Sequence, residues 1–347
     1  MNKTYKILIG IVSTILVLII GFVVYYNMNL SAVSKSDEQV IVTIESGSSQ
    51  YAALDALEDA GLIKNKTVAK VYLKLHPMDN LQANTYILNK NMDLKEMLSI
   101  LENPSFENIL KSKLTIPEGT RLVDIVDIIA DNTGLKSKDI LKKWSNKDYL
   151  KTLIKDYDML SDEILDEDIK YPLEGYLYPE TYYITEQEED IDHITRTLLD
   201  MTQTKINGLQ SSIDKMGYTV HEFLTLSSIV ECESLFDEDK PIIAGVFINR
   251  LNKDMALQSD ITVNYALNKT GVKVSYKQLE TDSKYNTYKY KGLPVGPVSN
   301  VCVDTMNAVV NYTKSDYLFF FAKEDGTVIY SKTVSEHEKA VEKYRWY

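Results

Sequence analysis

The sequence predicts an α+β protein that begins with a single transmembrane helix. Residues 7–26 carry no charge and are long enough to cross a bilayer as one helix. Behind them, short strand-like segments alternate with stretches whose apolar residues recur at helical spacing. The chain has 347 residues, which corresponds to about two folded domains at roughly 150 residues each.

The composition excludes several classes of protein. Hydrophobic residues make up 44% of the chain and charged residues 25%, as in ordinary globular proteins. There are 38 lysines and arginines against 50 aspartates and glutamates, a net charge of -12, so we expect no DNA or RNA partner. The four histidines and two cysteines do not stand at metal-ligand spacing, and no glycine-rich phosphate loop occurs. We therefore expect no metal and no cofactor.

The N-terminal apolar segment predicts a membrane anchor with a defined orientation. Lys3 and Lys6 precede residues 7–26, and the next charge in the chain is Lys35. Because positive charges near a spanning helix stay on the cytoplasmic side, residues 1–6 are expected in the cytoplasm. The body of the protein is then expected outside the cell membrane.

A cleaved signal peptide is the alternative interpretation of this segment. The triplet Ala32-Val33-Ser34 weakly resembles a cleavage site, but the apolar run is longer than a usual signal core, which favours a retained anchor. Residues 27–39 are polar and short. They are expected to form a linker that holds the first domain close to the membrane.

An internal duplication follows the linker. The segment 42–48 (VTIESGS) is echoed 72 residues later by 114–120 (LTIPEGT), and each copy runs into an amphipathic stretch. This pattern predicts a duplicated unit of strand, turn and helix. The first copy continues into a short strand at 85–88 and a further helix, so 40–112 is expected to form a small α/β module. Residues 113–170 hold the second copy and a helical connector.

Residues 171–182 read YPLEGYLYPETY. Two prolines, a glycine and four tyrosines in twelve residues predict an ordered loop rather than a helix. Two interpretations stay open for the aromatic rings: they are exposed and pack against sugars, or they form a core covered by the loop.

The stretch 221–235 (HEFLTLSSIVECESL) predicts a helix that carries a catalytic carboxyl group. Its apolar stripe contains Phe223, Leu226, Ile229 and Val230. On a helical wheel Glu233 lies roughly 30° from the centre of this stripe, and Glu231 roughly 130° from it. Because burial raises the pKa of a carboxyl group, Glu233 is the better general acid. The alternative is that Glu233 only ends the helix and has a structural role.

Further motifs follow in a fixed order along the chain. They are EGYLYPETY (174–182), AGVFINRL (244–251), LQSDITVNY (257–265), YNTY (285–288) and GLPVGPVSN (292–300). Together with LSSIVECE in the predicted helix, they resemble the YceG-like family of membrane-anchored endolytic murein transglycosylases. The resemblance covers nearly the whole chain, including the anchor.

This resemblance implies an activity and a fold. Family members cleave between MurNAc and GlcNAc within peptidoglycan strands, and the second glutamate of the Glu-x-Glu pair, here Glu233, is implied to be catalytic. A mixed α+β catalytic domain is implied for residues 171–347, and peptidoglycan synthases are implied as partners. The module at 40–112 resembles the LysM-like modules of cell-wall proteins, and a simple spacer domain is the alternative.

The resemblance and the polar run at 257–265 also indicate substrate-binding residues. Gln258, Asp260 and Thr262 belong to the polar run, which suits N-acetyl and hydroxyl groups. The family motifs add Tyr288, Pro294 and Asn300 as binding residues, and Glu231 and Glu174 as supporting residues. The alternative for Asp260 is a helix-cap role.

The expected reaction needs only one carboxyl group. Protonated Glu233 gives its proton to the glycosidic oxygen, and the carboxylate then takes a proton from the C6 hydroxyl of the same MurNAc, which attacks C1 and leaves a 1,6-anhydro end. Two rivals stay open. One is a hydrolytic muramidase that uses a second carboxylate, such as Asp260. The other is a noncatalytic cell-wall-binding scaffold.

The chain departs from the family pattern at both of its cysteines. Family members usually carry a basic residue between the two glutamates and Pro-Gly after the loop asparagine, where this chain has Cys232 and Val301-Cys302. In a domain outside the cytoplasm, this predicts a disulfide between Cys232 and Cys302. The alternative is two free, partly buried thiols.

Overall fold

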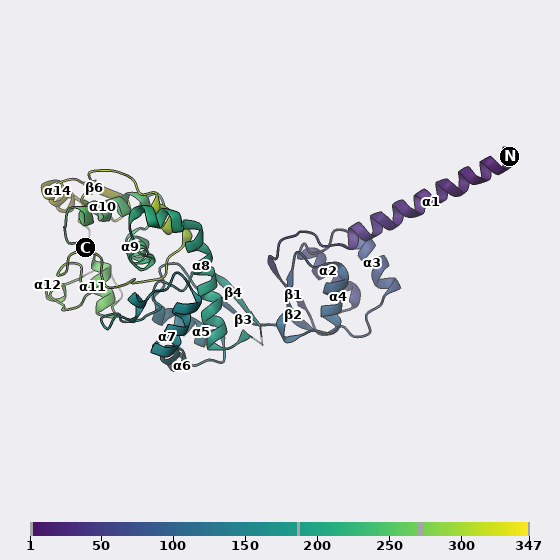
Figure 1. Cartoon of the computed structure of the whole chain (residues 1–347), viewed down its shortest axis with the longest axis horizontal. Coiled ribbons are helices and arrows are strands. Elements are labelled where there is room, and N and C mark those ends of the chain that lie inside the picture. The colour runs from purple at the N-terminus through teal and green to yellow at the C-terminus, as the bar shows by residue number, and fades with distance from the viewer. Residues whose placement is uncertain (1–2, 186–187, 270–273, 346–347) are drawn as a thin grey trace. The chain divides into compact units, whose positions relative to one another are not determined.

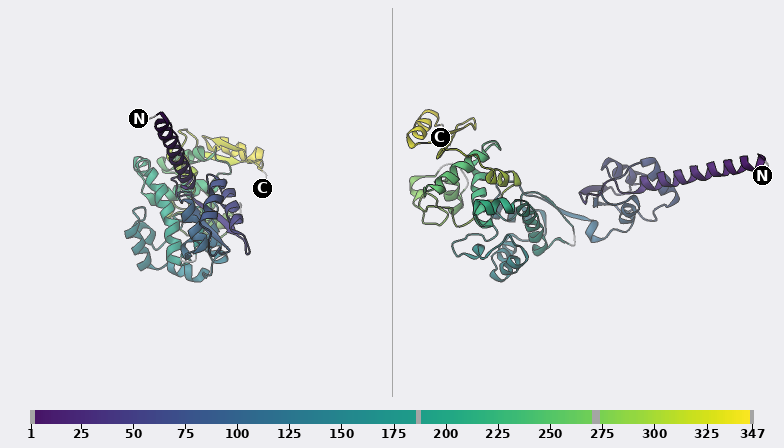
Figure 2. Two further views of the ribbon diagram at one scale, coloured as in Figure 1. Left: turned by 90° about the vertical axis from the view of Figure 1, so that its right-hand side faces the viewer. Right: turned by 45° about the horizontal axis from the view of Figure 1, so that its top comes forward.

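The N-terminal apolar segment forms one long helix, α1 (Lys3–Leu30), in the computed structural model. Within it, Ile7–Leu30 is long and apolar enough to cross a membrane. The structure describes residues 3–185, 188–269 and 274–345. They belong to two units, the first from 1–113 with 183–189 and the second from 114–182 with 190–347 (Figures 1 and 2).

The first unit packs three helices against a two-stranded antiparallel sheet. In this sheet Gln39 lies opposite Asn89, and Ile44 lies opposite Asn84. The apolar side chains of both strands and the helices share one core, which Leu30 at the end of α1 joins. The elements are β1 (Gln39–Ile44), α2 (Gln50–Asp59), α3 (Lys66–Leu75), β2 (Asn84–Asn89), α4 (Leu94–Glu102) and the 3-10 turn η1 (Phe106–Asn108).

The second unit is mainly helical, and in it β5 pairs with β6 as an antiparallel hairpin. A further pair of strands, β3 (Leu110–Thr115) with β4 (Thr181–Thr185), has residues in both units. The other elements of the second unit are α5 (Leu122–Asn132), α6 (Ser137–Trp144), α7 (Lys147–Asp156), η2 (Asp162–Leu165), α8 (Ile191–Met216), α9 (Val220–Glu233), α10 (Lys240–Asn252), α11 (Asp260–Ala266), α12 (Tyr276–Leu279), α13 (Val303–Val310), β5 (Phe319–Ala322), β6 (Val328–Ser331) and α14 (Val334–Tyr344).

The structure confirms the predicted α+β class and the duplicated unit of strand, turn and helix. β1 leads into α2, and β3 leads into α5. Thr43 and Thr115 hold equivalent places in the two copies, where each hydroxyl lies beside a threonine hydroxyl of the partner strand. The strand predicted at 85–88 lies within β2.

The aromatic loop is also confirmed, because residues 171–180 form turns and irregular backbone before β4 begins. Of the two interpretations of its rings, the structure supports the core, since Tyr176, Tyr178 and Tyr182 are buried. Gly175 allows the loop to pack closely, with φ +84 and no side chain. A Cβ atom there would lie 2.4 Å from the Cβ of Pro297.

Helix α9 occupies the centre of the second unit. It begins after a capping box in which Thr219 and Glu222 exchange hydrogen bonds, and it contacts α8, α10, α11 and α13. All side chains from Phe223 to Val230 are buried. The residues of the predicted apolar stripe are thus buried, but so is the opposite face, because helices surround α9 and the small residues Ser227 and Ser228 pack there.

Candidate active site

Glu233 is the last residue of α9, where the buried helix ends. Ser234 follows in an extended conformation, so the Glu233 side chain is half-buried rather than enclosed in the core. The hydroxyl of Ser259 donates a hydrogen bond of 2.6 Å to its Oε1. Burial raises the pKa of Glu233 to about 7, the nearby charge of Asp260 raises it too, and the Ser259 hydrogen bond opposes both effects. The group can hold and release a proton near neutral pH.

A second carboxyl group, Asp260, stands at the first position of α11. It is half-buried, and its Oδ1 accepts a hydrogen bond of 2.6 Å from the hydroxyl of Tyr288. Burial raises the pKa of Asp260, whereas the bond from Tyr288 lowers it. Burial and then Asp260 itself raise the pKa of the Tyr288 phenol, which keeps Tyr288 protonated as the donor.

Gln258 is exposed beside this carboxyl pair. Its backbone has φ +53, in the left-handed region that non-glycine residues seldom adopt. The buried guanidinium of Arg250 donates to the Leu257 carbonyl at 2.9 Å and to Gln258 Oε1 at 3.3 Å. Because Oε1 is already occupied by a donor, the amide NH2 of Gln258 is the end that is left to contact a ligand.

Three of the predicted binding residues are buried. Thr262 is fully buried and donates to the carbonyl of Ser259 at 2.8 Å. Asn300 is fully buried too, and its amide accepts from the Thr120 N–H and donates to the Pro117 carbonyl. Pro294 lies buried in the irregular segment 292–300. Thr262 thus packs against Ser259, and Asn300 joins its segment to the turn after β3, whereas Gln258, Asp260 and Tyr288 are less buried.

A clamp that the sequence analysis missed holds the 292–300 segment against α9. His221 Nε2 lies 2.8 Å from the Val295 carbonyl, and Nδ1 lies 2.8 Å from the Tyr176 hydroxyl. A carbonyl only accepts, so Nε2 carries a proton, and in the neutral ring Nδ1 accepts from Tyr176. No sequence signal indicated this clamp, because the three residues lie far apart in the chain.

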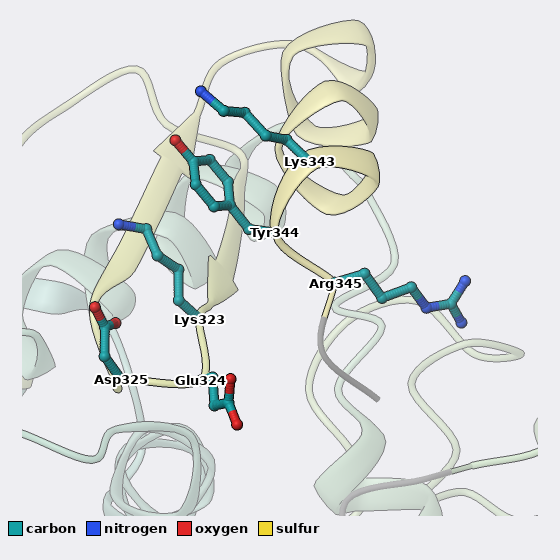
Figure 3. A pocket seen from close by; sticks show the side chains of 6 residues that line it. All are labelled: Lys323, Glu324, Asp325, Lys343, Tyr344 and Arg345. Atoms are coloured by element: carbon teal, nitrogen blue, oxygen red, sulfur yellow. The ribbon is translucent and has the colours of Figure 1, made fainter.

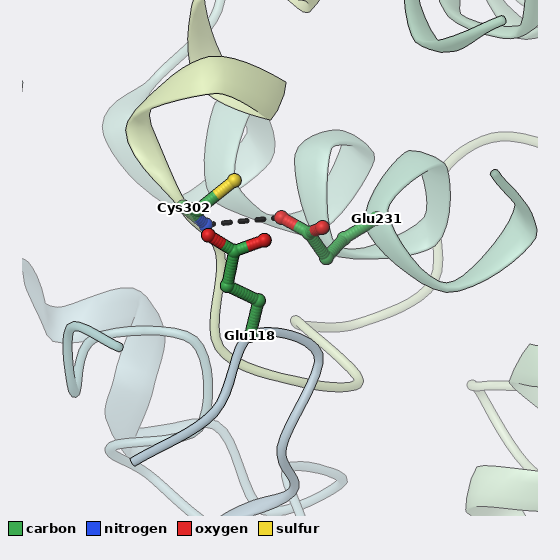
Figure 4. Close-up of side chains that lie close together, drawn as sticks. All are labelled: Glu118, Glu231 and Cys302. Atoms are coloured by element: carbon green, nitrogen blue, oxygen red, sulfur yellow. Dashed lines mark hydrogen bonds between the residues drawn. The ribbon is translucent and has the colours of Figure 1, made fainter. Parts of the chain in front are cut away.

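Glu231 is buried in an ion pair, although the helical wheel places it away from the apolar stripe. Its Oε1 lies 3.3 Å from Lys240 Nζ, and the side chains are only 5% and 6% exposed. Oε2 accepts from the Cys302 backbone N–H at 3.0 Å, and the exposed Glu118 approaches from the turn after β3 (Figure 4). The pair joins the ends of α9, α10 and α13.

The acceptor atoms of Glu118, Glu231 and Cys302 lie within 4.8 Å of one another, which is close enough to test as a metal site. The donor set does not suit a cation. The Lys240 ammonium already lies against Glu231 and would repel one. Burial raises the pKa of the Cys302 thiol to about 11, so it is a neutral group and a poor ligand at neutral pH.

The predicted disulfide between Cys232 and Cys302 is not formed. Both residues are free thiols. The Cys232 thiol donates to Ser299 Oγ at 3.2 Å, whereas Cys302 Sγ lies 3.8 Å from Lys240 Nζ and 3.5 Å from Thr305 Oγ1. The two sulfurs have separate partners, which is the alternative of two partly buried thiols.

Glu174 lies within the aromatic loop and is 1% exposed. It accepts the Leu122 N–H at the start of α5 at 2.8 Å and the Tyr265 hydroxyl at 2.9 Å. Burial raises its pKa to about 8. Glu174 therefore joins the aromatic loop to α5 and α11 inside the protein.

An open surface depression of about 710 Å³ lies at the C-terminal hairpin, away from these residues (Figure 3). It contains none of the predicted site residues. Its lining comes from the β5–β6 turn and the end of α14, namely Lys323, Glu324, Asp325, Lys343, Tyr344 and Arg345.

Comparison with known proteins shows the family of this chain. The sequence model of the YceG-like family matches residues 42–343. The chain belongs to the YceG-like family. This confirms the resemblance that the sequence motifs indicated.

Several YceG-like relatives match most of the chain. It is 36% identical over 330 residues to the endolytic murein transglycosylase of Bacillus subtilis (strain 168), covering 94% of this chain and 91% of that protein. It is 34% identical over 324 residues to the endolytic murein transglycosylase of Streptococcus pneumoniae serotype 2 (strain D39 / NCTC 7466). This match covers 89% of this chain and 59% of that protein. A crystal structure of a YceG-like protein from Listeria monocytogenes has a TM-score of 0.64 and 39% identity, and covers 88% of this chain and 99% of that one.

Proposed function

We propose that this protein is an endolytic peptidoglycan transglycosylase that cleaves the MurNAc-GlcNAc bond within nascent strands and leaves 1,6-anhydroMurNAc ends. The names of its relatives in Bacillus and Streptococcus support the class of reaction. The catalytic role is assigned to Glu233 because its carboxyl group is half-buried and its pKa is raised to about 7.

In this mechanism Glu233 serves both steps. Its protonated form gives a proton to the glycosidic oxygen as the bond from that oxygen to C1 breaks, and the GlcNAc hydroxyl leaves. The resulting carboxylate takes the proton of the C6 hydroxyl of the same MurNAc while O6 bonds to C1. The proton returns to Glu233, and no water is consumed. Because the nucleophile belongs to the substrate, its proximity contributes to the rate.

The surroundings of Glu233 support roles for its neighbours. Gln258 presents an amide NH2 that suits the carbonyl of an N-acetyl group, and Asp260 with Tyr288 suits sugar hydroxyls or the developing positive charge at C1. The family motifs assign Pro294, Thr262 and Asn300 to substrate binding, and the hydrogen bonds of Glu231 and Glu174 suit a supporting role in the fold.

A hydrolytic muramidase is the second candidate, because Asp260 is a second carboxyl group whose charge acts on Glu233. Such an enzyme activates water, and its products carry reducing ends that are heavier by one water. The donor Tyr288 already occupies one oxygen of Asp260, which favours a binding role for this group over that of a base.

The apolar helix α1 supports a location of the reaction at the cell membrane. Helix α1 acts as a single-pass anchor with residues 1–6 in the cytoplasm, since Lys3 and Lys6 precede the apolar run. The catalytic unit then acts on glycan outside the membrane, beside the synthases that polymerise it. The module at 40–112 serves as a LysM-like wall contact or as a spacer.

Mass spectrometry of products from purified peptidoglycan tests this proposal. The wild-type protein is expected to release anhydro-ended fragments, and Glu233→Gln is expected to lose the activity. Glu238→Gln is a matched control, because it makes the same change at an exposed position five residues further along. Products with reducing ends would favour the muramidase. Equal release by Glu233→Gln would exclude Glu233 as the catalytic group, and no release by the wild type would favour the noncatalytic scaffold.

A further inference from the structure

Ser259 is a buried hydroxyl residue that the proposed reaction has not used so far. It stands at the position before α11, where a serine usually caps the helix by accepting a backbone N–H. Here its side chain makes no cap bond. Instead its hydroxyl donates to Glu233 Oε1 at 2.6 Å, and the residue is only 2% exposed. The hydroxyl thus gives up a stabilising cap contact for a contact with the carboxyl group.

Two buried threonines fix the backbone of Ser259 from both sides. The Ser259 N–H donates to Thr287 Oγ1 at 3.0 Å, and the Thr262 hydroxyl donates to the Ser259 carbonyl at 2.8 Å. The two threonine hydroxyl oxygens lie 2.9 Å apart. Because the single proton of Thr262 goes to a carbonyl, Thr287 must donate to Thr262. Three hydrogen bonds therefore form a closed circuit through Ser259.

The backbone beside Ser259 is held in a strained conformation. Gln258 has φ +53, and its N–H donates to the Thr287 carbonyl at 3.1 Å. Such a conformation is unfavourable for a residue with a side chain, and it persists only where the surroundings impose it. The strained residue and the threonine circuit together fix the Ser259 backbone at a place from which its hydroxyl reaches Glu233 Oε1.

We propose that Ser259 is a positioning residue that keeps the reacting proton of Glu233 on Oε2. A buried O–H group without an acceptor is costly, and within residues 3–185, 188–269 and 274–345 the acceptor for this one is Glu233 Oε1. If Oε1 held the proton, the hydrogen of the Glu233 carboxyl group and that of the Ser259 hydroxyl would both lie between Oε1 and Ser259 Oγ. The proton therefore resides on Oε2, the oxygen that Ser259 leaves free.

The assignment of the proton to Oε2 rests on the proposed transglycosylase function. It also explains how one oxygen can serve both steps of that reaction. After proton transfer to the glycosidic oxygen, Oε2 is again the free oxygen and can accept the proton of the C6 hydroxyl. The same oxygen then serves both steps without rotation of the carboxyl group. The Ser259 bond also favours the carboxylate, so it lowers the pKa of Glu233 against the effect of burial.

The test compares Ser259→Ala with Ser259→Thr in the full chain, with peptidoglycan as the substrate. Ser259→Ala is expected to lower kcat about tenfold and to move the alkaline limb of the pH-rate profile upward by about one pH unit, the size expected for one lost hydrogen bond to a charged group. Ser259→Thr keeps a hydroxyl donor and should retain most of kcat and the wild-type limb. Ser211→Ala, at an exposed position in α8, is the matched control.

A measurement that does not depend on turnover separates this proposal from the proposed function. The carboxyl carbon of Glu233 is titrated by NMR in the wild type, in Ser259→Ala and in Ser259→Cys, which keeps a side chain of similar size with a weaker donor. A midpoint that rises in both variants supports the positioning role even if no anhydro product is found. An unchanged midpoint together with an unchanged pH-rate limb would overturn it.

Discussion

Replacement of Lys240 by methionine tests the buried ion pair behind the site. Lys240 Nζ lies 3.3 Å from Glu231 Oε1 and 2.8 Å from Asp237 Oδ1. Asp237 is 80% exposed, so its bond contributes little. Lys240→Met keeps the apolar stem and removes the charge, which leaves the buried Glu231 with the Cys302 N–H as its remaining partner.

The cost follows from the burial of both side chains. Removing one partner of a buried ion pair leaves an uncompensated charge and costs about 3–5 kcal/mol. In a unit of about two hundred residues, 3 kcal/mol corresponds to a decrease in Tm of about 6–12 °C. We expect a decrease in this range.

Thermal unfolding followed by circular dichroism, on the full chain in detergent, measures the change. Lys253→Met, at an exposed position just after α10, is the control and should change Tm little. The double variant Glu231→Gln/Lys240→Met should recover part of the lost Tm, because it also removes the unpaired buried charge of Glu231. A Tm for Lys240→Met within about 2 °C of the control would refute this reasoning.

Three further predictions concern the site and its support. Gly175→Ala should destabilise the second unit, seen as a lower Tm, because its Cβ would lie 2.4 Å from that of Pro297 at a φ of +84; an unchanged Tm would contradict the close packing. Asp260→Asn removes a charge that raises the pKa of Glu233, so the alkaline limb of the pH-rate profile should move to lower pH, opposite to Ser259→Ala; an upward shift would count against the electrostatic argument. Thiol titration of the denatured protein without reductant should find two thiols, and none would restore the disulfide.

The sequence predicted the elements whose signals are local. The echo of 42–48 at 114–120 indicated two strands followed by helices, and β1 with α2 and β3 with α5 are found there. The proline and glycine spacing of 171–182 correctly indicated a loop. The helix predicted at 221–235 corresponds to α9, which ends at Glu233.

The remaining features depend on contacts between distant segments. A helical wheel assigns one buried face, but α9 is enclosed by four helices, so Glu233 is half-buried because the helix ends there and not because of a stripe. The Ser259 contact and the His221 clamp join residues 26 and 74 positions apart. The pairing of Cys232 with Ser299, rather than with Cys302, likewise depends on packing that no local pattern encodes.

The proton affinity of Glu233 tests the central claim most directly. The carboxyl resonance is assigned by its absence in Glu233→Gln and followed by NMR from pH 3 to pH 10. We predict a midpoint at about 7, because burial penalises the carboxylate. A midpoint near the ordinary glutamate value of about 4.3 would contradict a general acid that stays protonated at neutral pH.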